Sequence, residues 1–347
     1  MPELFLFLSM KRRNKFFSLI LSCSALAFIS SAQSWQNDRY LDGYQEATVT
    51  MSPDYSGDVT CTVVRRLSDC GGDRAILYIH GYNDYFFQEE MGNRFVDSCW
   101  NFYAVDLRKY GRSLKSTQTP YQMRSISEYY PDIDSTINIM SRNGIKEIVL
   151  MGHSTGGLVA ASYMNHNPSN LIKAVVLNSP FLDWNMSPIV EKIAIPFISC
   201  IGRRFPNLKI SQGETSPYGE SLLKQYHGEW DFDTNLKTIK PRKVSAGWIR
   251  GISNAQSDLK NHSFIKVPIL LLHSTRTING DKWTPDHQSG DAVLDVNDIS
   301  RLGRTLGPDV TEISVEGGLH DLILSKDDIR NEVYNDIFGW LNTTLGK

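Results

Sequence analysis

Residues 151–157 read Met-Gly-His-Ser-Thr-Gly-Gly and place Ser154 between glycines, just after the apolar run 148–151. A serine hydroxyl is a weak nucleophile that attacks an acyl carbon only when an adjacent base takes its proton. Gly, Ser and Thr also form ordinary turns and helix caps, so the local pattern leaves a plain helix start as the alternative. The base and the group that orients it have to come from elsewhere in the chain.

The elements that would position such groups alternate between strand-like and helix-like segments. The strand-like runs are 44–51, 59–67, 75–80, 102–106, 147–151, 174–178, 269–273 and 310–315, and the helical candidates are 85–97, 125–142, 155–166 and 328–341. The first two strands read as an antiparallel pair, and the later ones are short continuous apolar runs, which suit strands buried on both faces. The pattern predicts an α/β fold with a mainly parallel sheet.

Polar residues follow several of these strands at their C-terminal ends, where open α/β sheets bind ligands. Ser154 follows the run 147–151, His320 follows 310–315, and a loop rich in aspartates follows 269–273. His320 can take the proton of Ser154, and an aspartate must then orient the imidazole and stabilise its cation. The chain order Ser, Asp, His is that of nucleophile-elbow hydrolases. The sequence therefore predicts a catalytic triad at this sheet edge.

Two backbone N–H groups are candidates for an oxyanion hole. The N–H of Thr155 opens the helix that follows Ser154, and the loop after the run 75–80 offers the N–H of Tyr82. Donors of this kind stabilise the negative charge that develops on the acyl oxygen during attack. Gly152 and Gly156 would relieve crowding where the strand turns sharply into the helix.

Four stretches together resemble the α/β-hydrolase superfamily: residues 80–84 (HGYND), 106–113 (DLRKYGRS), 152–157 (GHSTGG) and 317–321 (GGLHD). Within it, the chain is similar to the monoacylglycerol lipase and lysophospholipase-like branch, of the serine aminopeptidase S33 type, over roughly residues 45–345. The resemblance implies an eight-stranded, mostly parallel sheet flanked by helices, with an inserted cap. It also implies ester hydrolysis without a metal or cofactor.

The triad acid departs from the pattern of that family, whose members place it a few residues after the seventh strand. Here that position reads HSTRTING and holds no carboxylate. The stretch 290–295 (GDAVLD) resembles the acid-bearing segment of the family, which favours Asp291, with Asp281 and Asp295 as the alternatives. Residues 274–290 would then be an insertion that arches over the site.

The chain divides into a targeting segment and one enzyme domain. Residues 1–32 combine basic residues at 11–15, an apolar stretch at 16–29 and small residues at 30–32, the layout of a secretory signal peptide. The apolar stretch is shorter than the ~20 residues of a membrane span, so a signal peptide that is cleaved on export is favoured over a membrane or lipoprotein anchor. Residues 33–347 form the hydrolase domain, in which about 182–263, rich in prolines and aromatics, are the cap insertion.

Four cysteines remain beyond the signal peptide: Cys61, Cys70, Cys99 and Cys200. An even number in an oxidising compartment predicts two disulfides, with three possible pairings, of which Cys61 with Cys70 is the most local. Four buried free thiols are the alternative. No CxxC motif or Cys/His cluster indicates a zinc site.

These features predict an exported serine hydrolase that cleaves carboxylic esters through an acyl-enzyme. The expected substrate is a small-molecule or lipid ester, with transient contact with a membrane surface. The net charge of −2, without a long basic run beyond the N-terminus, argues against nucleic acid as a partner. A serine exopeptidase of the same fold and a non-catalytic exported binding protein are the alternatives.

Overall fold

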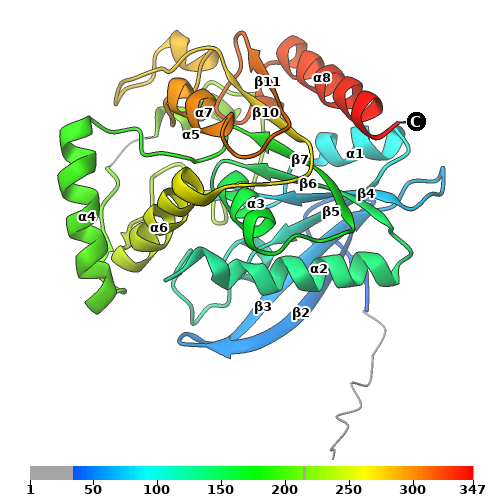
Figure 1. Ribbon diagram of the computed structural model, residues 1–347, viewed down its shortest axis with the longest axis horizontal. Helices are drawn as coiled ribbons and strands as arrows, with labels where there is room; N and C mark the ends of the chain where they lie inside the picture. Colours follow the sequence, from blue (N-terminus) through cyan, green and yellow to red (C-terminus); the bar gives the residue numbers. More distant parts are fainter. Residues whose placement is uncertain (1–33, 214–215, 347) are drawn as a thin grey trace, which may run out of the picture. The chain divides into compact units, whose positions relative to one another are not determined.

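A nine-stranded sheet forms the centre of the structure, a computed structural model that describes residues 34–213 and 216–346 (Figure 1). Its strand order is β1-β2-β3-β5-β4-β6-β7-β10-β11. The bounds are β1 Gln36–Asn37, β2 Gln45–Asp54, β3 Gly57–Arg66, β4 Arg74–Ile79, β5 Asn101–Asp106, β6 Glu147–His153, β7 Ile172–Asn178, β10 Ile269–Ser274 and β11 Val310–Val315. Within this sheet, β5, β4, β6, β7, β10 and β11 are parallel to one another. The pairs β1–β2, β2–β3 and β3–β5 are antiparallel.

The predicted α/β fold with a mostly parallel sheet is confirmed, but the predicted count of eight strands was wrong by one. The additional strand is β1, which contributes two residues at the sheet edge and pairs antiparallel with β2. A two-residue strand leaves no hydrophobic periodicity that a sequence pattern can detect.

Both faces of the sheet are covered by helices, as the continuous apolar strands require. Along β4, the side chains alternate between two separate core clusters: Leu77 and Ile79 belong to one, and Ile76 and Tyr78 to the other. The first cluster is closed by α2 (Tyr130–Arg142) and α3 (Thr155–His166), and the second by α1 (Glu89–Asp97) and α8 (Asp327–Leu345). The two pairs of helices lie on opposite sides of the sheet in Figure 1.

Helix α1 begins four residues later than the predicted 85–97. Tyr85 and Phe86 precede the helix, and aspartate side chains accept from their N–H groups: Tyr85 N donates to Asp84 Oδ1 at 3.0 Å, and Phe86 N donates to Asp106 Oδ1 at 2.9 Å. The aromatic rings of both residues are buried.

The segment between β7 and β10, termed here the β7–β10 insertion, holds most of the structure that the sequence pattern missed. It contains α4 (Pro188–Arg204), β8 (Lys209–Ile210), α5 (Pro217–Leu222), β9 (Val244–Ser245) and α6 (Ala246–His262). Helices α4 and α6 pack closely, and a Cβ on Gly202 would lie 2.3 Å from the carbonyl oxygen of Ala246. Figure 1 shows this pair of helices side by side.

One disulfide joins Cys70 to Cys99, with the two Cα atoms 5.5 Å apart, while Cys61 and Cys200 are free thiols. The prediction of two disulfides, and of the Cys61–Cys70 pairing, was therefore wrong. Cys61 is buried in β3, five residues before the end of that strand, and each strand residue adds about 3.3 Å. That separation from Cys70 exceeds the reach of a disulfide. Cys200 lies exposed on α4.

A hydrogen bond between side chains joins β10 to β11. His273 Nε2 lies 2.8 Å from Glu312 Oε1, and Arg304 also donates to this carboxylate. Burial by itself would raise the pKa of Glu312, but the hydrogen bonds from Arg304 and His273 outweigh it and lower the pKa to about 2. The carboxylate therefore stays ionised in the folded chain.

From Ser34 onward the chain forms one compact unit. Among the residues that the structure describes, no helix combines the length and the apolar composition needed to cross a bilayer. The predicted signal peptide at 1–32 lies outside the described residues.

Candidate active site

Ser154 sits at the sharp turn between β6 and α3, with φ 53° and ψ −118°. A positive φ in a non-glycine residue costs on the order of 1–3 kcal/mol and persists only where neighbours hold it. Here the N–H of Ser154 donates to the carbonyl of Asn178 at 3.0 Å, and its carbonyl accepts from the N–H groups of Leu158 and Phe181. The turn is thereby fixed, and the Ser154 side chain projects from the sheet edge into a cavity.

Two glycines make this turn possible because the backbone passes too close for a side chain. A Cβ on Gly152 would lie 2.5 Å from the carbonyl oxygen of Gly156, and one on Gly156 would lie 2.3 Å from that of Ile79. Both separations are far below van der Waals contact. The glycines that the sequence analysis singled out therefore allow the close approach of β6, α3 and β4.

The structure brings Ser154, His320 and Asp291 together in one hydrogen-bonded chain. His320 Nε2 lies 2.9 Å from Ser154 Oγ, and His320 Nδ1 lies 2.8 Å from Asp291 Oδ2. Asp291 is fully buried, and His320 is 2% exposed. Because the carboxylate only accepts, Nδ1 carries the proton and Nε2 presents a lone pair toward the serine hydroxyl. This is the tautomer that a general base requires.

Asp291 reaches His320 because the long loop after β10 closes on itself. Ile278 N donates to Asp291 O at 2.7 Å, and Asp291 N donates to Arg276 O at 2.9 Å, so Asp291 pairs with the segment that directly extends β10. Its Oδ1 accepts from the N–H groups of Val293 and Leu294, both at 2.8 Å, which fixes the carboxylate plane. The acid thus arrives beside the strand end although many residues intervene.

The expectation that residues 274–290 arch over the site was wrong. None of them lines the cavity at Ser154. The loop instead packs against α5, where Trp283 Nε1 donates to Ser221 Oγ at 3.0 Å and Gln288 Nε2 donates to Ser221 O at 3.0 Å. The base of this loop is closed by the backbone bridge between Thr277 and Asp291.

The two alternative acids lie elsewhere. Asp295 is the N-cap of α7 (Val296–Gly303), where its side chain accepts from Asn297 N at 2.9 Å. Asp281 is exposed in the loop that packs against α5. The carboxylate that meets His320 is that of Asp291.

The two predicted oxyanion-hole residues lie near Ser154: Thr155 follows it in the chain, and Tyr82 lines the same cavity. Thr155 is the first residue of α3, so its N–H belongs to the helix terminus, where backbone donors lack helical partners. Tyr82 lines the cavity, and its loop is tied to the β7–β10 insertion: Asn83 Nδ2 donates to Thr238 O at 2.7 Å, and Tyr82 OH donates to Arg242 O at 3.0 Å. These contacts hold the loop rigidly beside the serine.

A cavity of about 180 Å³ opens onto Ser154 and His320. The β7–β10 insertion supplies much of its wall, including Tyr218, Phe232 and Lys237. The ring of Tyr218 meets that of His320 edge-on, with centroids 5.3 Å apart. Sequence reasoning did not find Tyr218 or Lys237 because nothing in their neighbourhood marks them as part of a site.

The sheet order, the strained serine turn and the arrangement of serine, aspartate and histidine define an α/β hydrolase. Residues 72–327 match the family described as serine aminopeptidase, S33, and the chain belongs to this family. Phospholipase YtpA of Bacillus subtilis (strain 168) is 24% identical over 205 residues, which cover 57% of this chain and 74% of that protein. The uncharacterized hydrolase YugF of the same organism is 22% identical over 209 residues, covering 58% and 72%.

Solved structures confirm the fold. The monoacylglycerol lipase of Paleococcus ferrophilus aligns with a TM-score of 0.57 at 20% identity, covering 80% of this chain and 96% of that one. A soluble variant of monoglyceride lipase from Saccharomyces cerevisiae, in complex with a substrate analog, gives a TM-score of 0.60 at 15% identity, covering 86% and 96%. The predicted superfamily and branch are confirmed.

Proposed function

We propose that the protein is an exported serine hydrolase that cleaves carboxylic esters through a Ser154–His320–Asp291 triad. One observation carries the proposal: His320 lies within hydrogen-bond distance of both the Ser154 hydroxyl, at 2.9 Å, and the buried Asp291 carboxylate, at 2.8 Å. This arrangement supports Ser154 as nucleophile, His320 as base and Asp291 as the orienting acid of an acyl transfer.

In the proposed mechanism, Ser154 Oγ attacks the ester carbonyl while His320 Nε2 takes the hydroxyl proton. The N–H groups of Tyr82 and Thr155 stabilise the negative oxygen of the tetrahedral intermediate. His320 then gives the proton to the leaving alcohol, and an acyl-enzyme on Ser154 remains. Water, deprotonated by the same imidazole, releases the acid and restores the serine. Asp291 holds the imidazole in the required tautomer throughout.

The size of the cavity favours compact ester groups. A cavity of about 180 Å³ is smaller than the roughly 300–1,000 Å³ of pockets that enclose drug-sized ligands. We therefore expect p-nitrophenyl acetate and butyrate to be hydrolysed with higher kcat/KM than the palmitate ester. A panel of chain lengths measures this directly, and a preference for palmitate would contradict the size argument.

The nucleophile is tested with a fluorophosphonate probe, which labels activated serines covalently. Ser154→Ala should abolish both labelling and ester hydrolysis. Ser162→Ala is the matched control, since Ser162 is buried on the same helix α3 but its Oγ has no hydrogen-bond partner among the described residues. Labelling that persists in Ser154→Ala would refute the assignment.

A serine exopeptidase is the second candidate, because the family that the chain belongs to is described as serine aminopeptidase. An aminopeptidase needs an anionic group for the substrate ammonium. Among the described residues that line the cavity, Asp84 is the one carboxylate, and its Oδ1 already holds Lys237 Nζ at 2.9 Å, which disfavours it as the partner of a substrate ammonium. Aminoacyl p-nitroanilides assayed beside p-nitrophenyl esters separate the two activities.

Export is part of the proposal and is supported by the Cys70–Cys99 disulfide, since disulfides persist in oxidising compartments. Expression of the full chain followed by fractionation and N-terminal sequencing tests it. We expect the mature protein outside the cytoplasm to begin at Gln33. A chain that retains residues 1–32 would point instead to an anchor.

Transient contact with a lipid surface is also proposed, and α4 supports it. Ile189, Ile193 and Phe197 are 74%, 67% and 66% exposed along this helix, and the exposed Arg203 and Arg204 lie at its end. Apolar side chains beside basic ones suit an anionic membrane surface. Flotation with vesicles of phosphatidylglycerol should recover the protein and lose it in Ile193→Asp. The control is Phe264→Asp, which removes a 62% exposed phenylalanine outside α4.

A further inference from the structure

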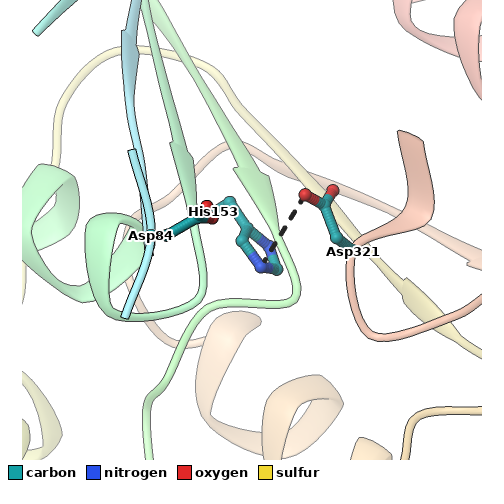
Figure 2. Close-up of side chains that lie close together, drawn as sticks. All are labelled: Asp84, His153 and Asp321. Carbon is teal, nitrogen blue, oxygen red and sulfur yellow. Dashed lines mark ion pairs between the residues drawn. The ribbon is translucent and has the colours of Figure 1, made fainter. Parts of the chain in front are cut away.

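Three buried side chains from different strand ends meet beside the triad. Asp84 follows β4, His153 is the last residue of β6, and Asp321 follows β11. They are 1%, 3% and 0% exposed. One carboxylate oxygen or ring nitrogen from each lies within 4.8 Å of the others. Figure 2 shows the imidazole of His153 between the two carboxylates.

Each of the three residues uses its second polar atom for an outer contact. His153 Nδ1 lies 3.2 Å from the carbonyl of Asn178, and a carbonyl only accepts, so Nδ1 carries the proton and Nε2 holds a lone pair. Asp321 Oδ1 accepts from Asn178 Nδ2 at 2.6 Å. Asp84 Oδ1 accepts from Tyr85 N and from Lys237 Nζ. These outer contacts orient the inner atoms.

The inner atoms are three acceptors that face one another. Asp84 Oδ2 has no hydrogen-bond partner within the described residues. His153 Nε2 faces Asp321 Oδ2 at 3.9 Å, and that oxygen also accepts from Gln88 Nε2 at 3.4 Å. Asp84 Oδ2 is therefore a buried acceptor without a donor, which is costly, and a cation held between the three atoms would satisfy it.

We propose that Asp84, His153 and Asp321 bind one divalent transition-metal cation of the zinc type. Imidazole nitrogen and carboxylate oxygen are its usual ligands, and a ligating histidine commonly donates its other N–H to a backbone carbonyl, as His153 does. Three atoms no more than 4.8 Å apart can all be reached from one point at about 2.8 Å, so bonds of about 2.1 Å need inward shifts of under 1 Å.

The local charge suits such a cation. The two carboxylates carry two negative charges, and Lys237 balances one of them through Asp84 Oδ1, which leaves Oδ2 free to coordinate. Burial lowers the pKa of His153 well below its usual value, which favours the neutral imidazole that binds metals. Burial also raises the pKa of Asp321, so a proton on that carboxyl is the competing occupant.

Calorimetric titration of ZnCl₂ into the tag-free, chelator-treated mature protein tests the site. A surface cluster could also bind zinc, because His166 Nε2 and His262 Nδ1 both contact Asp258, at 2.7 and 3.3 Å. The titration therefore uses a His166→Gln/His262→Gln background. We expect one Zn²⁺ per chain in this background, with proton release on binding and weaker binding at acidic pH, since the cation displaces the proton.

Two conservative variants in this background assign the ligands. Asp84→Asn and Asp321→Asn should each weaken Zn²⁺ binding at least 10-fold. His273→Gln is the matched control, because it removes a buried histidine that also pairs with a carboxylate, Glu312, and it should bind as the background does. Cobalt(II) added to the background protein should give visible ligand-field bands that Zn²⁺ abolishes.

Several results would overturn the proposal. The first is absence of saturable Zn²⁺ binding and of cobalt bands in the background protein, which does not depend on how the aspartate variants fold. The second is equal affinity in the background and in both aspartate variants. In either case a shared proton occupies the cluster. Circular dichroism of each variant confirms that a loss of binding reflects a lost ligand.

Discussion

Asp291→Asn separates the role of the triad acid from its role in the fold. The Asp291 carboxylate has two sets of partners: Oδ1 accepts from Val293 N and Leu294 N, and Oδ2 faces His320 Nδ1. An asparagine keeps the first set only if its amide oxygen takes the place of Oδ1. Its NH₂ group then faces His320 and donates to Nδ1. The imidazole must carry its proton on Nε2 and can no longer accept one from Ser154.

The expected loss follows from this inverted tautomer. Triads in which the aspartate is replaced by asparagine lose about 10⁴-fold in kcat. We expect about 10³- to 10⁴-fold here, which corresponds to about 4–5.5 kcal/mol of transition-state stabilisation. KM should change little, because Asp291 does not line the cavity. The midpoint temperature of thermal unfolding should also change little, because the N–H groups of Val293 and Leu294 both keep an acceptor.

Steady-state hydrolysis of p-nitrophenyl butyrate measures the effect, with active sites counted by fluorophosphonate titration. Asp281→Asn and Asp295→Asn are the controls, and both should keep kcat within about 3-fold of the parent protein, since neither contacts His320. Retention of more than a tenth of kcat in Asp291→Asn, or a larger loss in either control, would show that a different group orients His320.

Three further predictions concern the fold. In the protein without residues 1–32, a thiol reagent under native conditions should modify Cys200 but reach Cys61 only after unfolding, with two thiols in total, and a count of four would refute the disulfide. Gly156→Ala should destabilise the chain by about 1–3 kcal/mol, measured by urea unfolding, because of the clash at the serine turn. The pKa of Glu312 is about 2 in the folded chain against 4.5 ordinarily, so its contribution is present above pH 4.5 and is lost as the pH falls toward 2. Glu312→Gln should lower the free energy of unfolding at pH 7 by about 1–2 kcal/mol, allowing for solvent screening, and flatten its decline in that window; an unchanged decline would contradict the ion-pair argument.

The central sheet was predictable because its strands carry a strong local signal. Runs such as 148–151 and 269–272 are apolar at every position, and only a strand buried on both faces makes use of that pattern. The helix 155–166 was predicted with the bounds that the structure has, since the glycines and serine at its start mark the turn. Ser154 and His320 followed from their positions after such strands.

The β7–β10 insertion was less predictable because its structure depends on contacts distant in sequence. Helix α4 contains Pro196, which normally argues against a helix interior. Helix α6 contains Gly247 and Gly251, which lower helix propensity but allow close packing: a Cβ on Gly251 would lie 2.4 Å from Met123 Sδ. Tertiary packing overrides local preference at these positions. The cavity walls that the insertion supplies were hidden for the same reason.

The Asp84–His153–Asp321 cluster illustrates a second limit. The three residues come from the ends of three strands and are separated by many residues, so no motif joins them. Each residue taken alone reads as an ordinary loop or strand-end side chain. The sheet order places β4 next to β6, and the segment that follows β11 brings Asp321 to them, which together create the juxtaposition.

The position of Asp291 in space depends on its backbone pairing with the segment after β10. From the end of β10 the chain runs through Arg276, leaves the sheet edge and returns at Asp291, where two backbone hydrogen bonds close the loop. Loop-closure entropy grows slowly with length, by about 0.6 kcal/mol for each doubling, so a long excursion between these points costs little. The position of the acid is determined by the paired base of the loop, and the number of intervening residues is free to vary. The aspartate that contacts His320 is therefore Asp291, at which the chain returns to the end of β10. Asp281, the first aspartate after the strand, lies inside the loop.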